Sequence, residues 1–135
     1  MAIITQVGKK VNINSFSVVA DGDLSSYQYC AVMYSGASTG TVKVKAPTGQ
    51  GVMCAGILQT YDCDDAETAE IMDSGFSSAI AAEAFNSGVE LTPLDTTGKL
   101  EEAASGDYII AIAHQAATAA NEVVSVRVIV PYQKN

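Results

Sequence analysis

The chain has 135 residues and a formal net charge of −8, with 15 acidic against 7 basic residues and a hydrophobic fraction of 48%. A chain of this length and apolar content is expected to fold around a hydrophobic core. Apolar runs stay below the ~18 residues of a spanning helix, and the acidic excess repels phosphate groups. We therefore expect neither a membrane nor nucleic acid as a partner.

The first segment, MAIITQVGKK, is an apolar stretch followed by a glycine and two lysines. It lacks the pattern of a secretory signal, so we expect the protein to fold in a cytoplasm. An apolar terminal segment needs a partner within its own domain or outside it. We predict that residues 1–14 form either a docking arm or a first strand, and that residues 15–135 form a single β-rich domain.

Strand-like segments follow from residue 16 to residue 62. FSVVA (16–20) precedes an Asp-Gly-Asp turn, and YQYCAVMY (27–34) is apolar on both faces, which predicts a strand covered on both sides. In TVKVKAP, Val42 and Val44 are predicted to point inward. In GVMCAGILQTYD, Gly56 interrupts the side-chain row, which predicts a bulge or a close backbone approach.

One segment has helical spacing. After AEIMDSG, which is predicted to continue the sheet, the Ala-rich stretch 78–86 places Ile80, Ala84 and Phe85 at near-helical intervals. Gly88 stands where a helix would stop. The stretch therefore predicts a helix of two or three turns.

The last third of the chain returns to strands. Pro93 in VELTPL predicts an edge strand or a strand end, and YIIAIA (108–113) is apolar on both faces, which predicts a central strand. A single core-facing row is predicted for the last strand, formed by Val124, Val126, Val128 and Val130. Many strands, frequent turns and one short helix predict a mainly β fold, an antiparallel β-sandwich or barrel with one short helix.

Few residues support catalysis. The chain has one histidine, His114, and no G-x-S-x-G elbow. Cys30 and Cys54 lie in apolar segments, where a cysteine behaves as a small hydrophobe, and three cysteines do not favour a disulfide framework. We expect no catalytic residues and no enzyme activity; a hydrolase that uses Cys63 or His114 is the catalytic alternative.

The remaining polar clusters fit a solvated surface. DCDDAE (62–67) offers carboxylates that suit Ca²⁺ but lacks the spacing of an EF-hand, and a solvated loop is the preferred interpretation. Gly-Gln-Gly at residues 49–51 has no third glycine or lysine at phosphate-binding spacing. We therefore expect no metal and no cofactor. Six tyrosines fit an interaction surface and buried positions equally well.

From about Gly51 to Pro131 the chain resembles the phage capsid decoration, or cement, proteins. The resemblance lies in the apolar strand GVMCAGILQTYD, in the segment AIAAEAFNSGVELTPLDTTGKL, and in the closing pair GDYIIAIAHQAA and NEVVSVRVIV. It covers roughly the last two-thirds of the chain, and its motifs are patterns of small and apolar residues with Gly/Asp turns. The N-terminal third has no matching motif.

The resemblance implies a β-rich structural protein of a bacteriophage virion. Such a protein binds the outer surface of an assembled capsid, commonly as a homotrimer, and stabilises contacts between copies of the major capsid protein. We expect the shell contacts in the apolar and basic N-terminal segment, at Ala2, Ile3, Ile4, Val7, Lys9 and Lys10. The same segment fits an ordinary first strand equally well. A small carbohydrate- or receptor-binding module of a phage or cell-surface fibre is the alternative function.

Overall fold

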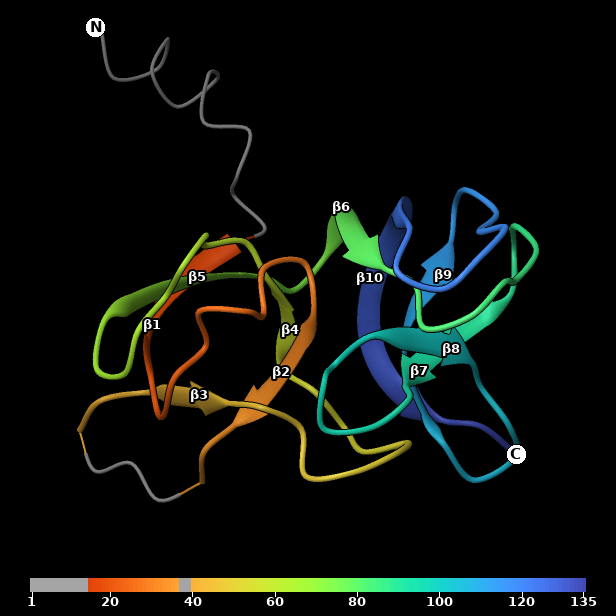
Figure 1. Ribbon diagram of the computed structural model, residues 1–135. Helices are drawn as coiled ribbons and strands as arrows, with labels where there is room; N and C mark the ends of the chain where they lie inside the picture. Colours follow the sequence, from red (N-terminus) through yellow and green to blue (C-terminus); the bar gives the residue numbers. More distant parts are fainter. Residues whose placement is uncertain (1–14, 37–39) are drawn as a thin grey trace, which may run out of the picture.

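The computed structural model describes residues 15–36 and 40–135, and these residues form ten strands and no helix (Figure 1). The first five strands are β1 (Ser15–Ala20), β2 (Ala31–Tyr34), β3 (Lys43–Lys45), β4 (Gly56–Leu58) and β5 (Thr68–Met72). The other five are β6 (Gly75–Ile80), β7 (Glu90–Pro93), β8 (Leu100–Glu102), β9 (Tyr108–Ala113) and β10 (Val123–Gln133). The predicted mainly β fold is confirmed.

The strands form two sheets that lie side by side, the first on the left of Figure 1 and the second on the right. The first sheet closes into a barrel in the order β1-β3-β2-β4-β5, with β1 and β3 parallel and the other pairs antiparallel. The second sheet has the order β6-β10-β9-β7-β8 and is antiparallel throughout. Residues 73–74 connect the two sheets between β5 and β6.

The predicted helix at residues 78–86 is wrong. Residues up to Ile80 belong to β6, and Ala81 and Phe85 form isolated bridges with Leu100 and Ala117. Backbone amides of this segment donate hydrogen bonds to residues distant in the sequence: the amide of Ala82 donates to the Leu100 carbonyl at 2.6 Å. A nine-residue helix is marginal by itself, so these tertiary hydrogen bonds decide the conformation.

The segment predicted as one strand at residues 27–34 is half turn. Only residues 31–34 form β2, because Tyr29 adopts a left-handed φ of +65° and the amide of Cys30 bonds back to the Tyr27 carbonyl. Val42 is also not inward as predicted: it precedes β3 and is 54% exposed, whereas Val44 is fully buried.

The long strand β10 departs from simple alternation. Val124, Val126 and Val128 are buried as predicted, but Val130 is 82% exposed. The pairing with β9 shifts register between Val128 and Tyr132, which breaks the inward row after Val128. The prediction for Val130 is therefore wrong.

The other strand predictions from the last third hold. β9 lies between β10 and β7, with Ile109, Ile110 and Ala111 buried, so the predicted central strand is confirmed. Pro93 ends β7, which is an interior strand, so Pro93 marks a strand end and not an edge.

The core has two parts. One cluster fills the barrel, and its members are Val18, Ala20, Leu24, Val32, Val44, Leu58, Cys63, Ala69 and Ile71. The second cluster lies where the barrel meets the other sheet: Ala31 and Ile57 from β2 and β4 pack with Leu91, Leu100 and Val126. The two sheets therefore share buried apolar surface, which supports the proposal of a single domain over residues 15–135.

Gly56 was predicted to mark either a bulge or a close backbone approach, and the structure shows a close approach. A Cβ at this position would lie 2.3 Å from the carbonyl oxygen of Met72 on β5. Only glycine lets β4 and β5 come together in this way.

Among the described residues, no helix is long and apolar enough to cross a membrane.

Candidate functional site

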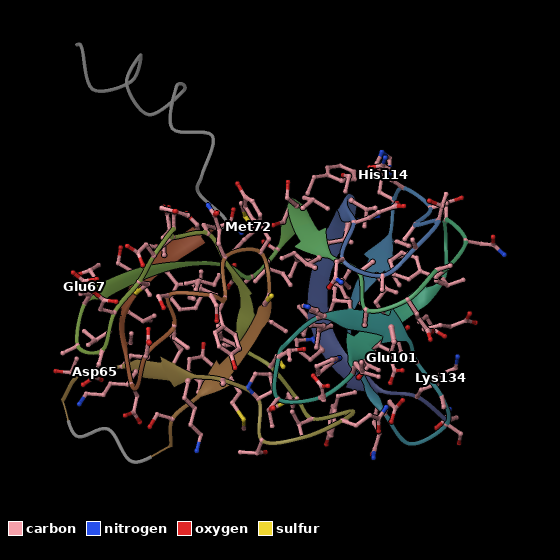
Figure 2. All side chains as sticks on the ribbon, viewed as in Figure 1. Asp65, Glu67, Met72, Glu101, His114 and Lys134 are labelled. Carbon is pink, nitrogen blue, oxygen red and sulfur yellow. The ribbon has the colours of Figure 1, made fainter. Side chains whose placement is uncertain are left out.

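The predicted shell contacts at Ala2, Ile3, Ile4, Val7, Lys9 and Lys10 lie outside the described residues. Their assignment stays a prediction. The chain leaves this segment at Ser15, which pairs with Met72 at the start of β1. Figure 2 labels Met72 at the upper edge of the molecule, on the side from which His114 also projects.

The three cysteines are free and buried. Burial raises the pKa of the Cys30 thiol to about 11 and that of Cys54 to about 12. The pKa of Cys63 is also raised, first by burial and then by the charges of Glu67, Asp64 and Asp23. A thiolate is the nucleophile in cysteine chemistry, so these environments disfavour a nucleophilic role.

His114, the other residue of the catalytic alternative, lies on the second sheet. Its ring contacts Phe76 edge to face, with ring centroids 4.8 Å apart. Cys63 instead belongs to the barrel cluster, so nothing in the described structure joins the two residues into a nucleophile–base pair. The geometry offers no support for the hydrolase alternative.

The acidic loop at residues 62–67 is held by its own hydrogen bonds. The amide of Asp64 donates to Glu67 Oε1 at 2.8 Å, and the amide of Gly22 donates to Asp65 Oδ1 at 2.8 Å. The pKa of Asp64 is raised, mainly by the charge of Glu67, because the carboxylates repel one another. Among the described residues, no group of three or more His, Cys, Asp or Glu side chains has an arrangement suited to a metal ion.

Three of the six tyrosines are exposed and three are half-buried. Tyr34, Tyr61 and Tyr132 are exposed, and Tyr27 is half-buried with its hydroxyl donating to the Thr96 carbonyl at 2.7 Å. A surface hollow of about 420 Å³ beside Tyr34 has only Gly36, Gly40, Thr41, Val42 and Lys43 as its other described lining residues. This lining brings together no acid and base, so it does not suggest an active site.

A different group of residues stands out on the outer face of the second sheet. Phe76 on β6 pairs directly with Arg127 on β10, and both side chains point away from the core because their neighbours Ser77 and Val126 are buried. His114 reaches across β10 to contact the Phe76 ring. We call Phe76, His114 and Arg127 together the Phe76 patch.

Sequence reasoning missed the Phe76 patch. Its members are separated by up to 51 positions and come from two strands and the end of a third. The available signal was composition, because His114 and Arg127 are the only histidine and the only arginine of the chain. Only the register of β6, β10 and β9 places them beside an aromatic ring that is 61% exposed.

No family model and no curated protein matches the sequence. The fold is similar to that of a solved phage protein. This is the crystal structure of the head fiber gp8.5 N base in bacteriophage phi29, with a TM-score of 0.65 and 14% sequence identity. The similarity covers 84% of this chain and 92% of that chain.

The likeness extends over both sheets of this chain. Each of the two sheets spans less than half of the chain, so a match over 84% includes most of both. The head fiber N base is covered almost completely, so the likeness is not confined to one part of that structure. At 14% identity the likeness concerns the fold, and residue roles are not transferred.

Proposed function

We propose that this chain is a structural protein of a bacteriophage virion that binds the outer surface of the assembled capsid and stabilises it, acting as a trimer. The likeness to the phi29 head fiber base, over most of both chains, is the observation that carries this proposal. It is independent of the resemblance of residues 51–131 to capsid decoration proteins. Both comparisons point to the phage head.

The features of the described chain support a structural role. The two sheets share a buried cluster and are joined by backbone hydrogen bonds, including Ala31 to Gly98 at 2.8 Å and Ile80 to Tyr29 at 3.0 Å. These contacts fix how the two sheets sit against each other. Its cysteines lie in environments that disfavour nucleophilic attack. We propose a non-catalytic role on these grounds.

The stabilising mechanism is thermodynamic linkage. A protein that binds the assembled shell and not its free subunits stabilises the shell by mass action. A trimer multiplies modest contacts, because the second and third subunits bind at a high effective concentration. The major capsid protein is the proposed partner, and the outer capsid surface is the proposed location.

The experiment uses shells of the phage that encodes this chain, prepared from a strain in which its gene is deleted. Purified protein is mixed with these shells, and co-sedimentation and the temperature of shell disruption are measured. We expect saturable co-sedimentation and a higher disruption temperature. Absence of co-sedimentation would refute the proposal. A variant that lacks residues 2–10 tests the predicted contact segment, and unchanged binding would exclude that segment.

A second candidate function is a small carbohydrate- or receptor-binding module of a fibre. The observation that favours it is that the similar solved structure belongs to a head fiber. Exposed aromatic rings such as Tyr61 and Phe76 suit stacking on sugars. Binding to a glycan array without co-sedimentation with shells would favour this function over capsid stabilisation.

A further inference from the structure

The Phe76 patch lies on the edge of the second sheet. β6 has β10 as its only neighbour in that sheet, so the Phe76 side chain stands on an edge strand with 61% of its surface exposed. Val123, on the same outer face of β10, is 55% exposed, and its partner Ile80 on β6 is half-buried. This part of the sheet therefore presents an apolar surface that stays largely exposed, with the His114 ring against the Phe76 ring.

Arg127 supplies a positive charge to this surface. Among the described residues, the Arg127 guanidinium forms no salt bridge and donates no hydrogen bond. The one salt bridge in that part of the chain joins Lys134 to Glu90. A lone arginine beside an aromatic ring, in a chain of net charge −8, is suited to a carboxylate on a partner. Arginine and exposed aromatic residues are also the residue types enriched in protein interfaces.

The chain itself presents the complementary surface. The acidic loop carries Asp62, Asp64, Asp65 and Glu67, all exposed, and Asp23 lies close enough to raise the pKa of Asp64. Figure 2 shows Asp65 and Glu67 at the far end of the barrel and His114 on the second sheet, at the other side of the molecule. One copy cannot bring its own two surfaces together, but two copies can.

We propose that the Phe76 patch binds the acidic loop of a second copy of this chain. Arg127 pairs with carboxylates of the neighbouring loop, and the Phe76 ring is covered in the same contact. The contact joins two different surfaces, so it is head-to-tail and closes into a ring when the rotation between copies permits. The inference deepens the proposed trimeric assembly by naming its interface.

The charges favour contact between the Phe76 patch and an acidic loop over contact between two acidic loops. The carboxylates of residues 62–67 repel one another, as the raised pKa of Asp64 reflects, and an arriving guanidinium relieves that repulsion. Like-charged contacts between two acidic loops are disfavoured for the same reason. The Phe76 ring adds apolar burial, which gives the contact strength that an exposed ion pair alone lacks.

The test measures self-association of the full chain in the absence of capsids, by sedimentation velocity at several concentrations and salt levels. We expect Phe76→Ser and Arg127→Glu each to weaken association by about tenfold or more, and high salt to weaken the wild type. Lys45→Glu, on β3 of the barrel, makes the same charge change outside the patch and should leave association unchanged. Circular dichroism verifies that each variant is folded.

The decisive variant exchanges the charges. Arg127→Glu combined with Asp62→Arg and Asp64→Arg should restore association, because each copy then offers the reversed pair, and Asp65 keeps its hydrogen bond from the Gly22 amide. The proposal is overturned by a wild type that stays monomeric at about 100 times the concentration used for shell binding, by association that survives Arg127→Glu, or by failure of the charge exchange to restore it. Loss of shell binding in these variants of a monomeric protein would assign the patch to the capsid instead.

Because self-association is measured without shells, its outcome is separate from the proposed function. A protein that associates through the patch and does not bind shells would retain this inference and lose the proposed function. A monomer that binds shells would refute this inference and the trimeric state, and would retain capsid binding as the function.

Discussion

The amide of Ala31 on β2 donates a hydrogen bond to the carbonyl oxygen of Gly98 at a distance of 2.8 Å, and this bond joins the barrel to the second sheet. A Cβ at Gly98 would lie 2.3 Å from the Ala31 carbonyl oxygen and 3.0 Å from its amide nitrogen. Gly98 ends the Asp-Thr-Thr-Gly turn between β7 and β8 and has a φ of +74°. The turn therefore rests directly on the backbone of β2.

Gly98→Ala should destabilise the protein strongly, because the added methyl group meets backbone that cannot move aside. We expect the free energy of unfolding to fall by about 3 kcal/mol or more, measured by chemical denaturation. Gly88→Ala is the matched control: Gly88 has a similar φ of +86° but open space around it. It should cost only about 1 kcal/mol, the expense of a left-handed alanine. Equal losses in the two variants would contradict the packing argument.

Two valines on β10 test the register shift. Val126 is fully buried, whereas Val130 is 82% exposed, although both have the same parity in the sequence. Val126→Ala should lower the free energy of unfolding by about 2 kcal/mol, and Val130→Ala by less than about 0.5 kcal/mol. Thermal or chemical unfolding of the two variants decides the matter. Similar losses would mean that the inward row continues past Val128.

Sequence patterns predicted the strands whose faces are set by local alternation. Val124, Val126 and Val128 follow the period of two, and the apolar run at residues 108–113 gives the central strand β9. These elements could be predicted because each residue's environment follows from its immediate neighbours. The pattern failed at Val130, where the register of a different strand, β9, decides the exposure.

Other failures have the same origin in distant contacts. The alanines after β6 have helical propensity, but Ala81 pairs with Leu100 and Asn121 donates to the Ala81 carbonyl. The turn at Tyr29 is fixed by Ile80, whose amide donates to the Tyr29 carbonyl from the second sheet. The Phe76 patch likewise depends on which strands become neighbours. Local sequence patterns do not show which distant strands become neighbours, so they could not predict these pairings.

The buried thiol of Cys54 makes stability depend on alkaline pH. Burial raises its pKa from 9.0 to about 12, so the unfolded chain loses this proton at a lower pH than the folded one. Its contribution is therefore fully present below pH 9.0 and is lost as the pH rises toward about 12. The free energy of unfolding should fall in this window by up to about 1.4 kcal/mol per pH unit for this thiol.

Cys54→Ala removes the titrating thiol, so this variant is compared with the wild type. The stability difference between the wild type and this variant, measured by urea denaturation from pH 7 upward, should shrink above pH 9.0. The folded wild type should also resist alkylation at Cys54 until it is unfolded, because the thiol is buried. A constant stability difference across the alkaline range would show that Cys54 titrates normally in the folded protein.

The carboxylate of Glu90 on β7 tests the packing of the C-terminal end of the chain against the second sheet. It accepts a hydrogen bond from the Tyr132 hydroxyl and pairs with Lys134 Nζ at 3.1 Å. The Tyr132 hydrogen bond, followed by that of Lys134, holds the pKa of Glu90 below its ordinary value of 4.5. A lowered pKa in the folded state adds stability above the unfolded pKa, and this is lost as the pH falls through the folded value.

Tyr132→Phe removes the first of these two donors while retaining the ring. The pKa of Glu90, followed by NMR titration of its side-chain carboxyl carbon, should rise toward 4.5, and the acid-induced loss of stability should become shallower. Tyr61→Phe removes an exposed hydroxyl on the barrel and should leave the titration of Glu90 unchanged. If Tyr132→Phe also left it unchanged, Lys134 alone would account for the lowered pKa, and the contact between the end of β10 and β7 would not involve the Tyr132 hydroxyl.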